Sequence, residues 1–156
     1  MLLDGAVDER GVPVALRSVG THATDGQPVS LRTRAALARV LGHTVDLDAH
    51  RAKLLDGDDL AWADLVVAME ASQVRALRRT HHESAARLAT LTTLAAHLTA
   101  DPRPLGERVA ALQLADRFPV DDEDVADPAG GDDEAYDAAM RALVERCDAL
   151  RRRLAG

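Results

Sequence analysis

The apolar run from Leu65 to Met69 is the feature that most restricts the fold of this chain. None of its side chains is polar, so both faces of the segment must be covered by other parts of the protein. The run has the length of a strand and is far shorter than the ~20 residues that a membrane-spanning helix needs. It therefore predicts a central strand of a parallel sheet with helices on both faces.

Helical and strand patterns alternate along the rest of the chain, as is typical of α/β folds. Apolar residues at helical spacing, caps such as Ser30 and Ser72, and the terminating Gly42 define the helices. We expect helices over 1–10, 30–40, 59–64, 72–80, 92–98, 105–117 and 132–154, and strands over 12–18, 65–69 and 87–90. Because there is no repeat and no long linker, a single domain over residues 1–156 is predicted.

Composition and charge exclude several classes of protein. A net charge of −7 and an aromatic content of 2% disfavour nucleic-acid binding, which relies on cationic and stacking side chains. The lone Cys147 excludes an internal disulfide and suits a reducing compartment. The first residues carry acids where a signal peptide would carry Lys or Arg, and no apolar run reaches ~18 residues. We therefore expect a cytoplasmic protein that binds neither nucleic acid nor a membrane.

Two patterns imitate catalytic or metal sites. Cys147 and Arg153 satisfy a bare cysteine-x5-arginine spacing, but the residues between them continue a helix near its C-terminus, where the helix dipole raises the pKa of a thiol. We interpret Cys147 as a structural residue. The adjacent His81 and His82 point in different directions and have no ligand at a recognised spacing, so no metal site is expected. No cofactor-binding fingerprint is present either.

Asp127 is the most suggestive residue for chemistry. It precedes Pro128 and a pair of glycines, and the proline would stiffen the loop. A carboxyl group held in this way can protonate a leaving-group oxygen and later activate water, although a solvated turn ahead of a helix explains the segment as well. His50, followed by Arg51 and Lys53, could order a loop near an anion or could simply be solvated.

Five segments together resemble the low-molecular-weight protein-tyrosine phosphatase family, in order and in rough spacing. They are Arg17-Ser18-Val19-Gly20-Thr21, Gly42, His50-Arg51-Ala52-Lys53, Ala63-Asp64-Leu65-Val66-Val67-Ala68-Met69-Glu70 and Asp124-Val125-Ala126-Asp127-Pro128, and residues 92–98 also resemble a helix of actinobacterial members. The resemblance implies a three-layer, flavodoxin-like α/β fold whose parallel sheet has strand order 2-1-3-4. It also implies cleavage of phosphotyrosine through a cysteinyl-phosphate intermediate without metal or cofactor, with Asp127 as general acid and Ser18 and His50 in supporting loops.

The chain departs from the family at its start. It lacks the first strand and the phosphate loop, which carry the nucleophilic cysteine and the phosphate-binding arginine. The missing strand would lie in the centre of the sheet, between the strands at Val14 and Val66. Because unpaired buried amides cost about 1 to 3 kcal/mol each, we expect the domain to be N-terminally incomplete and the native chain to extend a few tens of residues upstream. Ala129 replaces an aromatic residue that usually lines the phosphotyrosine ring, which leaves another substrate open.

Two functions from different classes follow. The first is a phosphatase that is inactive as written because its nucleophile loop is absent, and the resemblance implies a phosphotyrosine protein as its partner, such as a bacterial tyrosine kinase. The second is a pseudophosphatase that acts as a binding or scaffolding protein. Arsenate reduction on the same fold would require more cysteines than Cys147 alone.

Overall fold

A computed structural model describes residue 3 and residues 6–156 of the chain. Its sheet consists of two parallel strands, β1 (Val66–Ala68) and β2 (Leu88–Thr90), with Val66 opposite Leu88 and Ala68 opposite Thr90. The helices are α1 (Leu31–Leu41), α2 (Gly57–Trp62), α3 (Ala71–Thr80), α4 (Leu91–His97), α5 (Leu105–Ala110) and α6 (Asp133–Leu154), with 3₁₀ turns η1 (His82–Arg87) and η2 (Asp121–Glu123).

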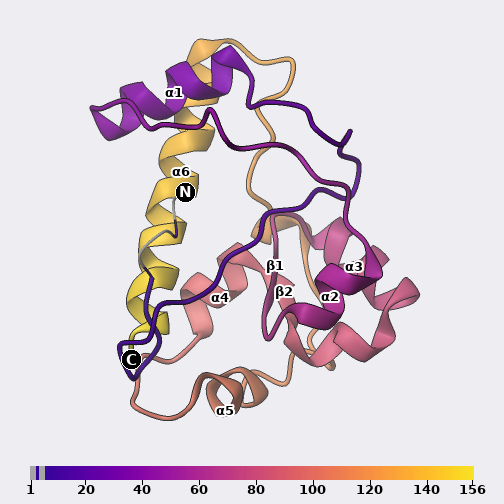
Figure 1. Cartoon of the computed structure of the whole chain (residues 1–156). Coiled ribbons are helices and arrows are strands. Elements are labelled where there is room, and N and C mark those ends of the chain that lie inside the picture. The colour runs from indigo at the N-terminus through magenta and orange to yellow at the C-terminus, as the bar shows by residue number, and fades with distance from the viewer. Residues whose placement is uncertain (1–2, 4–5) are drawn as a thin grey trace.

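Helices cover both faces of the sheet. Alternate side chains of a strand point to opposite faces, and on one face Val66, Ala68 and Leu88 pack with Val74 of α3. On the other face Val67 and Ala89 pack with α4 and α6. The long helix α6 runs along one side of the molecule, with α1 across its N-terminal half and α4 beside its C-terminal half (Figure 1). The α/β class and the parallel strand at 65–69 are therefore confirmed.

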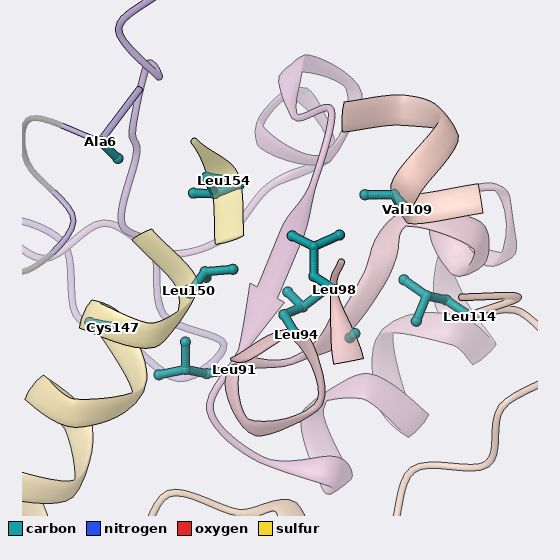
Figure 2. Close-up of a cluster of buried hydrophobic side chains, with 10 residues drawn as sticks. Ala6, Leu91, Leu94, Leu98, Val109, Leu114, Cys147, Leu150 and Leu154 are labelled. Atoms are coloured by element: carbon teal, nitrogen blue, oxygen red, sulfur yellow. The ribbon is translucent and has the colours of Figure 1, made fainter. Parts of the chain in front are cut away.

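The largest buried cluster lies between α4, α5 and the C-terminal half of α6 (Figure 2). Its buried members are Ala6, Ala89, Leu91, Leu94, Leu98, Val109, Leu114, Cys147, Leu150 and Leu154. Burial of a leucine side chain contributes about 1.5 to 3 kcal/mol, so this cluster is the main source of stability.

The capping residues act largely as the sequence predicts. Ser30 precedes α1 and its hydroxyl accepts a hydrogen bond from the amide of Thr33 at 3.0 Å, while Gly42 ends the helix with a φ of 75°. Only glycine adopts this left-handed conformation without strain. The cap predicted at Ser72 is wrong: α3 begins at Ala71 with Glu70 as its N-cap, and the hydroxyl of Ser72 donates to the Glu70 carboxylate at 2.9 Å.

Three predicted elements are wrong or shorter. Residues 6–10 form no helix, because Val7 instead pairs with Pro13 in an isolated antiparallel bridge; positions 1–2 and 4–5 of the predicted helix lie outside the described residues. Residues 12–18 form no strand, since no neighbouring strand supplies a ladder of backbone partners there. Helix α5 ends at Ala110, and the chain then turns through Gln113, whose φ of 49° is incompatible with helix.

Arg108 joins the ends of three segments inside the core. Its side chain is fully buried, and its guanidinium donates to the carbonyls of Thr99 (3.0 Å), Arg153 (2.5 Å) and Leu154 (3.0 Å). It also forms an ion pair of 3.1 Å with Glu9. The side chain therefore supplies donors to the carbonyls at the end of α6, which have no partner within the helix.

Replacement of Arg108 by leucine is expected to lower the free energy of unfolding by about 3 kcal/mol, because the Glu9 carboxylate and three carbonyls lose a buried partner. Urea titration followed by circular dichroism measures the change. Arg152→Leu is the matched control, since Arg152 is exposed and makes no side-chain hydrogen bond among the described residues; its effect should stay within about 0.5 kcal/mol. Equal effects of the two substitutions would contradict the role of Arg108.

Candidate functional site

A cavity of about 320 Å³ lies at the carboxyl end of β1, bounded by the loop that carries Asp127 and by the N-terminal half of α6. Its walls are formed by Thr33, Met69, Glu70, Val125, Ala126, Asp127, Pro128, Tyr136, Ala139, Met140 and Leu143. Ligands of open parallel sheets bind beyond the carboxyl ends of the strands. The position of the cavity therefore marks it as the candidate site.

Three contacts fix the loop that precedes Asp127. The amide of Val125 donates to the carbonyl of Met69 at 2.9 Å, directly beyond the end of β1. The carboxylate of Asp124 accepts a hydrogen bond of 2.6 Å from the amide of Ala71 at the start of α3. The buried Glu123 accepts a hydrogen bond of 2.9 Å from Thr90 at the end of β2. The loop is thus tied to the ends of both strands.

Asp127 is exposed on the cavity wall. One of its carboxylate oxygens accepts a hydrogen bond of 2.9 Å from the amide of Ala129, which closes a turn around Pro128. Gly130 follows with a φ of 82°, and Asp132 then caps α6. The turn holds the carboxyl group at the mouth of the cavity, where a general acid could reach a bound leaving group.

The other two predicted site residues lie in loops that touch each other but do not line the cavity. Ser18 is exposed in an extended segment, and His50 is half-buried, with its amide donating to the carbonyl of Leu47 at 3.1 Å. Gly20, close to Ser18, forms a parallel bridge with Leu54, near His50. The structure therefore brings the two supporting loops together, whereas Asp127 alone of the three contributes to the cavity.

Cys147 occupies the core. Its side chain lies within α6, 6% exposed, and burial together with the neighbouring Asp148 raises the pKa of the thiol to about 11. Arg153 does not face the sulfur, because its guanidinium donates to the carbonyl of Leu98 at 2.5 Å. The cysteine-arginine spacing therefore forms no anion site, in agreement with the structural interpretation of Cys147.

Sequence reasoning did not anticipate the wall that α6 contributes. The sequence predicted a helix over 132–154 without assigning its faces, and Tyr136, Met140 and Leu143 of this helix line the cavity. Glu70, at the end of the apolar run, is the second carboxylate on the wall. The one signal in the sequence is the length of α6, which exceeds that of the two short strands, so that part of its apolar face extends beyond the sheet.

The described residues contain no group of three or more His, Cys, Asp or Glu side chains placed to hold a metal ion. His81 and His82 lie 3.5 Å and 3.7 Å from the same carboxylate, that of Glu83. Within that part of the chain, no helix combines the length and the apolar character needed to cross a membrane.

The fold and the cavity at the strand ends define an α/β protein with a candidate site beyond its parallel strands. Residues 1–107 match the family model described as low molecular weight phosphotyrosine protein phosphatase, and the chain belongs to this family. A comparison with curated proteins gave no match.

Solved structures of phosphatases share the fold. The YwlE arginine phosphatase from Geobacillus stearothermophilus is 22% identical, with a TM-score of 0.66 over 96% of this chain and 80% of its own. A low molecular weight protein tyrosine phosphatase from T. tengcongensis is 26% identical, with a TM-score of 0.66 over 96% of this chain and 86% of its own. The tyrosine phosphatase AmsI of Erwinia amylovora is 17% identical, with a TM-score of 0.61 over 85% and 70% of the two chains.

Burial should make Cys147 unreactive in the folded chain. A rise in the thiol pKa from 9.0 to about 11 lowers the thiolate fraction at pH 8 about a hundredfold, because each pKa unit changes it tenfold. We expect iodoacetamide to alkylate the folded protein at least about a hundredfold more slowly than the same chain in urea, as followed by mass spectrometry. Similar rates in both states would contradict this environment.

Replacement of Asp124 by alanine should loosen the Asp127 loop. It removes an acceptor for the first amide of α3, which typically costs about 1 kcal/mol. We expect that loss of stability together with faster hydrogen exchange at the amide of Val125. Asp122→Ala is the control, since Asp122 is exposed and makes no side-chain hydrogen bond in the described part of the chain. Unchanged exchange at Val125 in the Asp124 variant would show that Asp124 does not hold the loop.

Proposed function

We propose that this chain is the part of a protein-tyrosine phosphatase domain that supplies the general acid, Asp127, and that it does not hydrolyse phosphate monoesters by itself. One observation carries the proposal. The single cysteine of the sequence, Cys147, is buried in α6 with a raised pKa, while Asp127 is exposed on the wall of a cavity at the strand ends.

The reaction of the family needs a thiolate that attacks phosphorus and an acid that protonates the leaving oxygen. The acid then takes a proton from the water that cleaves the cysteinyl-phosphate. Cations and amide groups must also stabilise the charge on the transferring phosphoryl group. The cavity offers the acid, but its walls contain no cysteine, lysine or arginine, which supports an inert chain.

The physiological partner in this proposal is a cytoplasmic phosphotyrosine protein, such as a bacterial tyrosine kinase. The tyrosine phosphatases among the similar solved structures support phosphotyrosine as the substrate group. The similar arginine phosphatase makes phosphoarginine the competing substrate group. The proposal also includes a four-stranded family sheet, of order 2-1-3-4, whose central strand is absent from this chain. Among the described residues β1 pairs with β2 alone, so its other edge is open to such a strand, which supports this part of the proposal.

A pseudophosphatase that binds or scaffolds partners is the second candidate. The observation that favours it is the charge of the cavity, because Glu70 and Asp127 on its walls would repel a phosphate group that meets no cation there. In this case the surface loops would retain partners, and no addition to the chain would produce turnover.

Hydrolysis of para-nitrophenyl phosphate distinguishes the two. The chain alone should give no turnover above buffer, and Cys147→Ser should behave in the same way. A fusion that places the first strand and cysteine-x5-arginine loop of the T. tengcongensis phosphatase before residue 1 should become active. Within the fusion, Asp127→Asn should lower kcat by about a hundredfold or more.

Three outcomes would count against the proposal. Turnover by the unmodified chain that disappears in Cys147→Ser would make Cys147 the nucleophile. A folded fusion without activity would favour the pseudophosphatase. An active fusion that tolerates Asp127→Asn would remove Asp127 from the reaction.

A further inference from the structure

Helix α1 belongs to a segment whose two ends meet. The backbone of Pro28 pairs with that of Arg51 in an isolated antiparallel bridge, and the amide of Ala52 donates to the carbonyl of Gln27 at 2.8 Å. Residues 29–50, which include α1, therefore leave the rest of the molecule and return to it at one place. We call residues 29–50 the flap, and the Pro28–Arg51 bridge its hinge.

Side chains within the flap hold it together. The guanidinium of Arg34 donates to the carbonyls of Val29 (3.2 Å) and Leu47 (3.1 Å) and to the carboxylate of Asp48 (2.6 Å). These partners lie before and after α1, so one side chain joins both arms of the flap to the helix. All flap residues are described by the structure, and none of them belongs to the two buried clusters beside the sheet. The flap is therefore cohesive and separate from the core.

Ion pairs attach the flap to α6, where α1 crosses the N-terminal half of the long helix (Figure 1). Arg39 forms a bidentate pair with Asp137, in which Nε–Oδ2 and Nη2–Oδ1 are 3.0 Å and 2.6 Å apart. Arg32 pairs with Asp133 at 3.0 Å, and its guanidinium lies 4.2 Å from the centroid of the Tyr136 ring. Three contacts of charged groups therefore join the two helices.

Charge outweighs apolar burial in this contact. Helix α1 carries three arginines and no acid, whereas residues 133–137 of α6 include three acids. The buried residues of α1 are Ala36 and Leu37 alone within the described chain. The two arginines that reach α6 have side chains that are 41% and 43% exposed. Ion pairs as exposed as these are weak and are screened by salt.

The flap covers one side of the candidate site. Thr33 of α1 lines the cavity, and so does Tyr136, on which Arg32 stacks. If the ion pairs to α6 break, the flap can turn about its hinge, and the wall formed by Thr33 moves with it. The carboxyl group of Asp127 stays in place, because the contacts that fix its loop reach the strand ends and α3 and not the flap.

We propose that the flap is a gate to the candidate site, which its ion pairs with α6 keep closed. Weakening of these pairs lets the flap leave α6 and opens the cavity to solvent and to larger molecules. The open state needs only a small population to admit a ligand, since a minor conformer can still bind. The inference concerns access to the cavity and does not depend on phosphatase chemistry.

Thiol labelling of a cavity residue tests the proposal. Ala139 lines the cavity and is 9% exposed, so Ala139→Cys places a thiol behind the closed flap. Iodoacetamide labelling is followed by mass spectrometry of the peptides, which separates this thiol from Cys147. We expect labelling at least about fivefold faster in about 1 M than in about 0.1 M sodium chloride, relative to N-acetylcysteine, because the screening length falls from about 10 Å to about 3 Å.

Charge variants of Ala139→Cys identify the ion pair that closes the gate. Asp137→Arg places two cations opposite each other and should speed labelling in low salt at least about fivefold. Adding Arg39→Asp reverses the pair and should restore slow labelling. Arg75→Gln is the matched control, because Arg75 pairs with the exposed Asp121 outside the flap, and it should leave the rate unchanged. Circular dichroism checks that each variant folds.

Three results would overturn the inference. They are labelling of Ala139→Cys that does not depend on salt, slow labelling of a folded Asp137→Arg variant, and a reversed pair that labels as fast as Asp137→Arg alone.

Tyr136 provides a test in the unmodified chain, which decides the matter even if the variants do not fold. It is the single tyrosine of the sequence, and its ring signals in NMR spectra should shift with salt as Arg32 leaves the ring. Ring signals that stay constant would contradict the gate. Because none of these readouts is enzymatic, their outcome is independent of the phosphatase assay.

Discussion

The structure depends on a parallel ladder of three residue pairs between β1 and β2. Its alternating side chains divide the interior into two clusters, one under α3 and one between α4, α5 and α6. Parallel strands need a connection that crosses over one face, and η1 together with α3 provides it. The candidate site lies beyond the carboxyl ends of these strands, and α6, which lines it, packs on β2 through the larger cluster.

Arginine side chains provide much of the polar support around so small a sheet. Arg108 donates to carbonyls at the end of α6, and Arg78 donates to the carbonyls of Arg117 (2.6 Å) and Leu114 (2.5 Å). A guanidinium group carries five donors in a rigid plane, so one side chain can satisfy several loop carbonyls. These hydrogen bonds hold irregular segments in place, a role that backbone pairing between strands would have in a wider sheet.

The local patterns in the sequence predicted much of the fold. The apolar run gave β1, and Ser30 and Gly42 marked both ends of α1, because these signals act through neighbouring backbone. The strand predicted over residues 12–18 was wrong for the opposite reason. Alternating apolar and polar residues favour a strand, but a strand forms only beside a partner strand, and the described residues supply none for this segment. Arg108 and the α6 wall of the cavity depend on contacts between distant segments, which no local pattern records.

The position of Asp127 is fixed by contacts that are independent of any reaction. Its loop is fixed by Val125 and Asp124 against the ends of β1 and α3, and these contacts require no substrate. A general acid contributes only when a leaving group is bound within hydrogen-bond distance. The fold therefore accounts for where the carboxyl group stands, while the general-acid role proposed for it requires a nucleophile and a phosphate clamp at the same strand ends. For this reason, family membership and turnover are separate properties of the chain.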